Sequence, residues 1–211
     1  MTNVSVFEEA ALAYDAWFDR HRPVYESELL ALKRFLPAAG GGLEIGVGTG
    51  RFAVPLGIRI GVDPAQAMAA MARRRGIRVL QAVAEALPFS GASFRLAVLV
   101  TTLCFLKDPF AALEEAARVL KPGGRLIIGI IDQDSPLGRR YEASKKDSAF
   151  YREARFYAVS QVLGWLAKLP FRDLKTCQTL FKDLGEITGP EPVKDGYGAG
   201  GFVVIAATRE A

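Results

Sequence analysis

The feature that most constrains this chain is a short apolar run that ends in three alternating glycines. Residues 43–45 are followed directly by Gly46, Gly48 and Gly50, and Glu44 lies inside the run. A strand that ends in glycines just before a helix lets a ligand approach the backbone closely, with N–H groups directed at it. The segment 43–50 therefore predicts a binding loop at the end of a buried strand.

The surrounding chain predicts a sheet to which that strand belongs. Between apolar runs, residues 64–75 and 110–120 carry apolar side chains at helical spacing, with Pro64 in a first helical turn and residues 121–124 as the stop after the second helix. Strand and helix thus alternate, which predicts a mostly parallel sheet with right-handed crossovers. The runs lack polar alternation, as expected for strands buried on both faces, and are residues 43–45, 58–62, 77–80, 96–100 and 126–131.

The remaining segments complete one predicted domain over residues 1–211. Residues 1–38 are expected to form an N-terminal helical cap of two amphipathic helices that separate near Pro23. Residues 40–131 are the binding core. Residues 132–170 are expected to be a polar insertion on the substrate side, followed by a helix that Ser160 caps. In residues 171–211, the stretches 174–181 and 201–208 predict an antiparallel hairpin of terminal strands.

The composition excludes several other classes of protein. Of the 211 residues, 50% are hydrophobic and 24% charged, with a formal net charge of +4, which suits a globular chain and gives no reason to expect a nucleic-acid partner. No apolar run approaches the roughly 20 residues that span a bilayer, and the first residues lack the pattern of a secretory signal. Cys104 and Cys177 form no disulfide framework or metal-ligand spacing. We expect a cytoplasmic protein without a metal.

The carboxylate of Glu44 discriminates between two kinds of ligand. Gly48, Gly50 and Ala53 satisfy the permissive dinucleotide pattern, so a nicotinamide cofactor is one interpretation. A buried carboxylate beside the glycines would repel a pyrophosphate, but it would attract a ligand that carries a cationic amino group. The charge therefore favours the cationic ligand.

These residues resemble the first motif of the class I S-adenosylmethionine-dependent methyltransferases, an acidic residue followed by Gly-x-Gly-x-Gly. The resemblance extends to Asp63, where the family places an acid that binds the ribose hydroxyls, and to residues 84–89 and 118–124. The Leu-Pro-Phe and Leu-Lys-Pro-Gly-Gly sequences in those two segments are similar to ubiquinone and menaquinone biosynthesis methyltransferases, a small-molecule branch. That branch usually has an aspartate where this chain has Val83, which leaves Glu85 or the Ala84 backbone to bind adenine.

The resemblance implies an α/β fold with a Rossmann-like, doubly wound sheet of seven mostly parallel strands. A terminal antiparallel hairpin, an N-terminal helical cap and an insertion after the fifth strand complete it. The implied cofactor is S-adenosyl-L-methionine, with S-adenosyl-L-homocysteine as its product. The residues expected to bind it are Tyr14, Glu44, Gly46, Gly48, Gly50, Asp63, Pro64, Met68, Ala84, Glu85 and Thr101.

Aromatic side chains of the cap and the insertion are the candidate acceptor-binding residues. The sulfonium of such a cofactor already activates the methyl group, so the protein must mainly hold a nucleophile in line with the C–S bond and exclude water. No catalytic residue is assigned. Residues 101–104 lack the Asn/Asp-Pro-Pro-Tyr/Phe sequence of enzymes that methylate amide or exocyclic amino groups. The candidates for the acceptor are Trp17, His21, Tyr25, Tyr141 and Tyr151.

The predicted function is methyl transfer by in-line displacement to a small-molecule acceptor. Two other functions stay open at this point: a nicotinamide-dependent oxidoreductase, and a catalytically inactive regulatory protein that has the same fold and binds the cofactor. Val83 and the scarcity of candidate bases, with His21 as the only histidine, keep the inactive protein open. The atom that is methylated and the oligomeric state stay undetermined.

Overall fold

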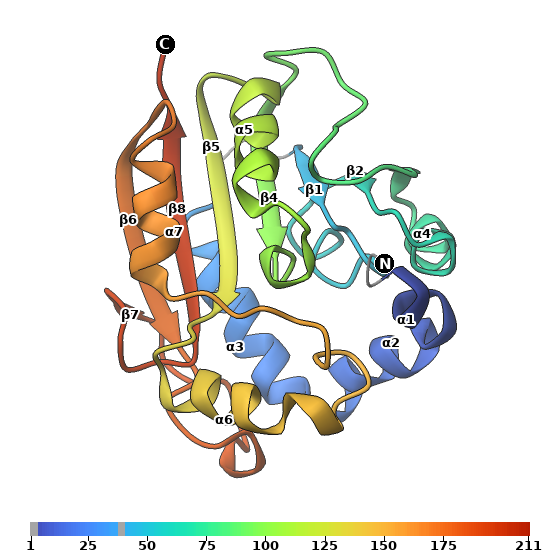
Figure 1. Cartoon of the computed structure of the whole chain (residues 1–211), viewed down its shortest axis with the longest axis vertical. Helices are drawn as coiled ribbons and strands as arrows, with labels where there is room; N and C mark the ends of the chain where they lie inside the picture. The colour runs from blue at the N-terminus through green and yellow to red at the C-terminus, as the bar shows by residue number, and fades with distance from the viewer. Residues whose placement is uncertain (1–3, 38–40) are drawn as a thin grey trace.

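The structure is a computed structural model, and it describes residues 4–37 and 41–211. One sheet runs through these residues, with the strand order β3-β2-β1-β4-β5-β8-β6-β7 (Figure 1). The strands are β1 (Leu43–Ile45), β2 (Ile60–Val62), β3 (Arg78–Leu80), β4 (Phe94–Val100), β5 (Leu120–Ile131), β6 (Phe171–Thr179), β7 (Lys194–Asp195) and β8 (Phe202–Arg209).

The pairing confirms a mostly parallel sheet with antiparallel strands at its C-terminal edge. The pairs from β3 to β5 are parallel, whereas β8 is antiparallel to both β5 and β6. The described residues form eight strands rather than the predicted seven, because the two-residue strand β7 adds an antiparallel edge beside β6. The chain moves from β1 toward β2 on one side and returns to β4 on the other, which places a ligand crevice at the carboxyl ends of these strands.

The sheet has an apolar core on each of its two faces. Alternate residues of β8 point to opposite cores: Val203 and Ile205 join the cluster beneath α5 (Pro109–Val119) and α7 (Val159–Leu166). Phe202 and Val204 join the other cluster, which α3 (Arg22–Lys33) covers. A strand with both faces covered must be apolar on both, and this is why period-2 alternation is missing from the sequence.

The helix expected directly after the glycines is absent, and residues 49–57 form a series of turns instead. Pro55 has no N–H, so the carbonyl of Arg51 loses the donor that a helix would give it. The hydroxyl of Tyr25 donates a hydrogen bond to that carbonyl. Gly50 and Gly57, with φ of +83° and +71°, delimit the segment with backbone angles that no helix has.

The N-terminal cap contains three helices over its described residues, where two were predicted. These are α1 (Val4–Glu9), α2 (Ala11–Arg20) and α3. Pro23 does not separate helices but lies in the first turn of α3, where a missing N–H costs nothing, and the break falls at His21. Pro64 was expected in a first helical turn, yet α4 (Gln66–Arg74) begins two residues later.

Two further boundaries differ from the prediction. Residues 121–124 do end α5, but they lie within β5 as an irregularity, since Phe94 pairs with Leu120 and Leu96 with Arg125. Helix α7 begins at Val159 after Ala158, so Ser160 lies inside the first turn and is not its cap.

The predicted insertion contains α6 (Pro136–Ser144), which lies with α1, α2 and one end of α3 near the carboxyl ends of β4 and β5 (Figure 1). These helices cover the end of the sheet where a ligand would bind.

Candidate functional site

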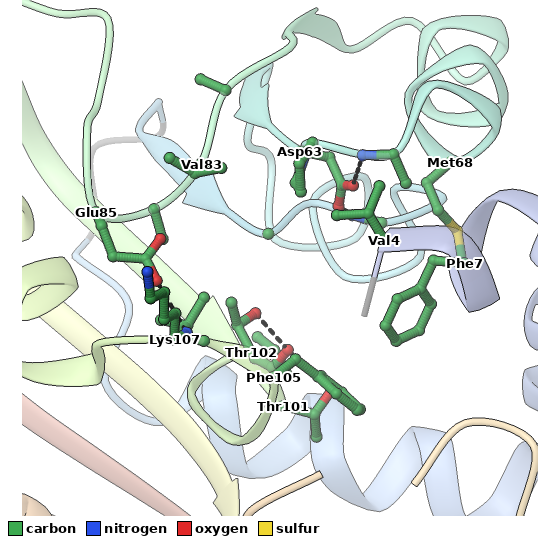
Figure 2. Close-up of a pocket in the computed structure, with 18 of the residues that line it drawn as sticks. Val4, Phe7, Asp63, Met68, Val83, Glu85, Thr101, Thr102, Phe105 and Lys107 are labelled. Atoms are coloured by element: carbon green, nitrogen blue, oxygen red, sulfur yellow. Dashed lines mark hydrogen bonds between the residues drawn. The ribbon is translucent and has the colours of Figure 1, made fainter. Parts of the chain in front are cut away.

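A pocket of about 820 Å³ opens at the carboxyl ends of β1, β2 and β4. All of the predicted cofactor residues except Glu44 and Gly50 line it, and Figure 2 shows Asp63 and Glu85 at opposite sides with Thr101 and Thr102 below them. Sequence reasoning missed Val4 and Phe7, because α1 is too short to show a periodic pattern. The lining residues are Val4, Phe7, Tyr14, Gly46, Gly48, Asp63, Pro64, Ala65, Met68, Ala82, Val83, Ala84, Glu85, Val100, Thr101, Thr102, Phe105, Leu106 and Lys107.

Each of the three positions in the loop requires glycine for a different structural reason. A Cβ at Gly46 would lie 2.5 Å from Cγ2 of Thr102, whose hydroxyl donates to the Ile45 carbonyl and ties β4 to β1. At Gly48 a Cβ would meet only the ring of Tyr14, at 3.7 Å, so this glycine leaves room in the pocket. At Gly50 a Cβ would lie 2.8 Å from Cδ1 of Ile77. Gly50 therefore has a packing role and is not among the residues that line the pocket, so its predicted contact with a ligand stays a prediction.

Asp63 follows β2 and faces the pocket with a carboxylate that the backbone holds in place. The N–H of Gly48 donates to its Oδ2 at 2.8 Å, and the N–H of Ala65 donates to its Oδ1 at 2.9 Å. Burial raises the pKa of Asp63 to about 6, and the two backbone hydrogen bonds oppose that rise. A carboxylate accepts about four hydrogen bonds, so Asp63 can still accept from a ligand's hydroxyl groups.

Glu44 lies in β1 with 1% of its surface exposed and is not among the residues that line the pocket. Burial raises its pKa well above the usual range, and the charge of Asp63 adds to the rise. Its Oε2 atom has no hydrogen-bond partner among the described residues. An unpartnered buried acceptor is costly, so a donor from a bound ligand or a water would complete it. The predicted contact of Glu44 with the cofactor therefore stays a prediction.

The segment that follows β3 forms the opposite wall of the pocket. Val83 and Ala84 line it, and the side chain of Val83 is 40% exposed. Glu85 also lines it, but its Oε1 accepts from the backbone N–H groups of Lys107 and Asp108 at 3.0 and 3.2 Å. Glu85 thus joins this wall to the loop before α5, and its carboxylate is partly occupied by that contact.

Asp15 fixes α2 above the glycine loop. Its Oδ1 accepts from the Thr49 hydroxyl at 2.7 Å, and its Oδ2 pairs with Arg51 and Arg75 at 2.7 and 2.8 Å. Burial would raise the pKa of Asp15, but the two guanidinium groups lower it below its usual range. The neighbouring Tyr14 is consequently held over Gly48. Sequence analysis did not identify this cluster, since its members come from three distant segments.

Thr101 lies where the pocket meets a second chamber. Its φ of +48° is unfavourable for a β-branched residue, and such strain is concentrated at functional sites. Burial, together with the charges of Glu44, Glu28 and Asp63, raises the pKa of Tyr14, while the Thr101 side chain opposes that rise. The hydroxyl of Tyr14 therefore stays protonated at neutral pH.

The second chamber has an empty volume of about 900 Å³ and aromatic walls. Tyr14, Thr101 and Phe105 line both chambers, so the two meet at these residues. Several rings are in contact around it, including Tyr14 with Phe150 and Tyr151 with both Phe105 and Tyr141. The lining residues are Tyr14, Trp17, Phe18, Val24, Glu28, Phe52, Thr101, Phe105, Ile131, Leu137, Tyr141, Ser148, Phe150, Tyr151, Leu180 and Leu184.

Three of the five predicted acceptor residues line this chamber, and two do not. Trp17, Tyr141 and Tyr151 are in its wall. Tyr25 is directed to the carbonyl of Arg51, where it replaces the helix hydrogen bond that Pro55 prevents. His21 lies between α2 and α3, stacks on Trp17 with ring centroids 4.5 Å apart, and has Nδ1 3.0 Å from the Trp17 carbonyl. The contacts of His21 thus hold it at the junction between α2 and α3, and it does not line the chamber.

The comparisons with known proteins agree with this geometry. A family model described as a methyltransferase domain matches residues 43–128. A solved structure from Thermotoga maritima, described as an SAM-dependent methyltransferase and possible histamine N-methyltransferase, is 51% identical, with a TM-score of 0.94 and coverage of 98% of this chain and 99% of that one. The chain belongs to the S-adenosylmethionine-dependent methyltransferases. Its fold is the Rossmann-like fold of this family, and its cofactor is S-adenosyl-L-methionine, so the nicotinamide interpretation is set aside.

Two curated relatives extend the comparison. A protein of Methanocaldococcus jannaschii is 48% identical over 206 residues, which are 98% of this chain and 100% of that protein. The demethylmenaquinone methyltransferase of Lactococcus lactis is 28% identical over 158 residues, covering 72% of this chain and 58% of that enzyme. The methyltransferase is thus similar to the menaquinone branch that its Leu-Pro-Phe and Leu-Lys-Pro-Gly-Gly sequences indicated.

The described residues fit this cofactor. Asp63 faces the pocket with free acceptor capacity, Gly48 leaves room beside Tyr14, and Glu44 offers an unpartnered buried oxygen nearby. Within residues 4–37 and 41–211, no group of three acidic, histidine or cysteine side chains could hold a metal ion. No helix in the same residues is long and apolar enough to cross a membrane.

Proposed function

We propose that this methyltransferase transfers the methyl group to a small molecule that binds in the aromatic chamber. The observation that carries the proposal is that two chambers meet at Tyr14, Thr101 and Phe105, which line both of them. A methyl transfer needs two sites that meet at one point, because the acceptor atom must reach the methyl carbon in line with the bond that breaks.

Each chamber has side chains suited to one of the two molecules. In the first, Asp63 would accept hydrogen bonds from the ribose hydroxyls, and Gly46 and Gly48 would let the cofactor approach the loop. The cofactor supplies an activated methyl group, so the chain must orient the acceptor and exclude water. In the second, Trp17 and Tyr151 would pack against the acceptor, as their place in its wall suggests.

The size and cover of the second chamber support a small acceptor over a macromolecule. Its wall is made mainly by side chains of α2, α3, α6, the residues around Tyr151 and the segment that holds Leu180 and Leu184. The relative from Thermotoga maritima is described as acting possibly on histamine, which is a small molecule of the size such a chamber would hold.

Mass spectrometry of a metabolite mixture tests the proposal. Purified protein is incubated with S-adenosyl-L-methionine and an extract of small molecules, and methylated products are identified with a methyl-labelled cofactor as the tracer. We expect labelled products, and we expect Tyr151→Ala, which removes a ring that lines the second chamber and not the first, to reduce them strongly while binding of S-adenosyl-L-homocysteine persists. Labelling of protein or RNA alone, with no labelled small molecule, would contradict the proposal.

A further inference from the structure

The aromatic chamber contains one buried carboxylate that folding does not use. Glu28 lies in α3 with 6% of its surface exposed and lines the chamber on the same helical face as Val24. Among the residues the structure describes, none donates a hydrogen bond to it or forms an ion pair with it. Lysine, arginine and histidine are also missing from the described lining of this chamber.

Three other buried carboxylates of this protein have partners that offset the cost of their burial. Asp15 pairs with Arg51 and Arg75, and Asp63 accepts two backbone hydrogen bonds. Glu191 accepts from the backbone N–H groups of Phe181 and Lys182. Leaving a buried carboxylate without such partners destabilises a fold. Glu44 also has an unpartnered oxygen, but Glu28 is the one that lines the aromatic chamber, so a ligand in that chamber can supply its missing partner.

The surroundings of Glu28 define the charge and shape of that ligand. Trp17, Tyr141, Tyr151 and Phe150 line the same chamber and present aromatic surfaces to its interior. Aromatic faces attract cations and also pack against apolar carbon skeletons. A carboxylate among such rings is complementary to an organic ammonium group, whereas it would repel a carboxylate or phosphate ligand.

We propose that Glu28 determines acceptor specificity by pairing with the protonated amino group of a small, mainly apolar amine. This inference rests on the proposed function, because it concerns the chamber assigned to the acceptor. The carbon skeleton of the amine packs against the aromatic wall, and its ammonium group donates hydrogen bonds to the Glu28 carboxylate. Glu28 is a specificity-determining residue and needs no direct contact with the methyl group.

The charge state of Glu28 gives the inference a second readout. Burial raises its pKa to about 8, so the carboxyl group is mostly protonated at pH 7 when the chamber is empty. The titratable groups that face it are Tyr14, Tyr25, Tyr141 and Tyr151, and burial raises the pKa of each, so they stay neutral. When an ammonium group pairs with Glu28, the carboxyl group of Glu28 must therefore lose its proton to the buffer.

Titration calorimetry with matched ligands tests the inference. The protein is first saturated with S-adenosyl-L-homocysteine, which measures cofactor binding by itself. It is then titrated with 2-phenylethylamine, 3-phenylpropylamine and hexylamine, each paired with the alcohol of the same skeleton. The variants are Glu28→Gln, which keeps the shape and removes the charge, and Glu26→Gln, which changes a half-exposed glutamate of the same helix that pairs with Arg22 and does not line the chamber. Buffers of different ionisation enthalpy report the protons released.

We expect at least one amine to bind tenfold or more tightly than its alcohol. Glu28→Gln should lower the affinity for that amine tenfold or more, leave alcohol binding unchanged and abolish the proton release at pH 7. Glu26→Gln should behave like the unmodified protein. If no amine is preferred over its alcohol, or if Glu28→Gln binds the amine normally, the inference is overturned. Failure of S-adenosyl-L-homocysteine to bind would instead count against the proposed function.

Discussion

The cofactor chamber and the aromatic chamber are built in different ways. The first consists largely of backbone and small residues at the ends of β1, β2 and β4, held by hydrogen bonds such as that from Gly48 to Asp63. The second consists of large side chains from α2, α3, α6 and two later segments. If the proposed assignment of the two chambers holds, the edge of the sheet supplies most of the cofactor site, and helices packed over that edge supply most of the acceptor site.

The dependence of the first chamber on backbone geometry predicts the largest effect. Gly46→Ala should lower the free energy of unfolding by about 3 kcal/mol, since it combines a positive φ with a Cβ 2.5 Å from Thr102. It should also weaken S-adenosyl-L-homocysteine binding beyond detection. Denaturant unfolding and calorimetry measure the two effects.

Gly57→Ala is the matched control for Gly46→Ala. Gly57 has a φ of +71°, but no atom lies within 4 Å of an added Cβ. This variant should lose only about 1 kcal/mol and bind the cofactor product normally. Equal losses in the two variants would show that the contact with Thr102 does not matter.

Asp63 predicts a pH dependence that belongs to the cofactor chamber alone. Its pKa of about 6 means that the carboxylate becomes protonated as the pH falls through 6 and loses acceptor capacity for the ribose. Affinity for S-adenosyl-L-homocysteine should fall by up to about tenfold per pH unit below 6. Asp63→Asn should bind about 30-fold more weakly at pH 7.5, with little further loss on acidification. A pH dependence that survives in Asp63→Asn would assign it to another group.

Burial of Glu28 in the aromatic chamber predicts that the stability of the folded protein depends on pH. Its folded-state pKa of about 8 exceeds the usual 4.5, so between these values the folded protein holds a proton that the unfolded chain releases. Stability should therefore decrease as pH rises from 4.5 to 8, by at most about 1.4 kcal/mol per pH unit from this group. In urea unfolding, the free energy of unfolding of Glu28→Gln should rise relative to that of the unmodified protein as the pH increases over this range. That of Glu26→Gln should show no such rise. Parallel stability curves for all three proteins would contradict the burial argument.

The smallest expected change in stability comes from Thr101, where the two chambers meet. Thr101 has a φ of +48°, which glycine adopts without strain, so Thr101→Gly should raise the free energy of unfolding by up to about 1 kcal/mol. Methyl transfer should nevertheless slow, because the side chain between the two chambers is lost. A variant that is less stable than the unmodified protein would show that the Thr101 backbone carries no strain.

The sequence predicted the first chamber better than the second. Gly46, Gly48 and Asp63 lie in one contiguous strand-loop-strand unit, so spacing along the chain is nearly spacing in the fold. Glu44 and Gly50 belong to the same unit but are not in the pocket lining, and a motif does not distinguish a packing role from ligand contact.

The second chamber depends on contacts between distant segments, which spacing does not encode. The sequence did not distinguish Tyr25 and His21 from Trp17 as candidates. Tyr25 donates to the carbonyl of the distant Arg51, and His21 contacts the carbonyl of Trp17 one turn earlier. Glu28 was missed, although one signal was available: it lies four residues after Val24 and four before Leu32, on the apolar face of α3. A charged residue on such a face is the pattern to examine in similar caps.

A crystal structure with S-adenosyl-L-homocysteine and an amine that binds would test the central claim most directly. The account predicts the ribose hydroxyls at Asp63, the sulfur at the junction of Tyr14, Thr101 and Phe105, and the ammonium group within hydrogen-bond distance of Glu28. An amine bound outside the aromatic chamber, or a sulfur directed away from the junction, would contradict it.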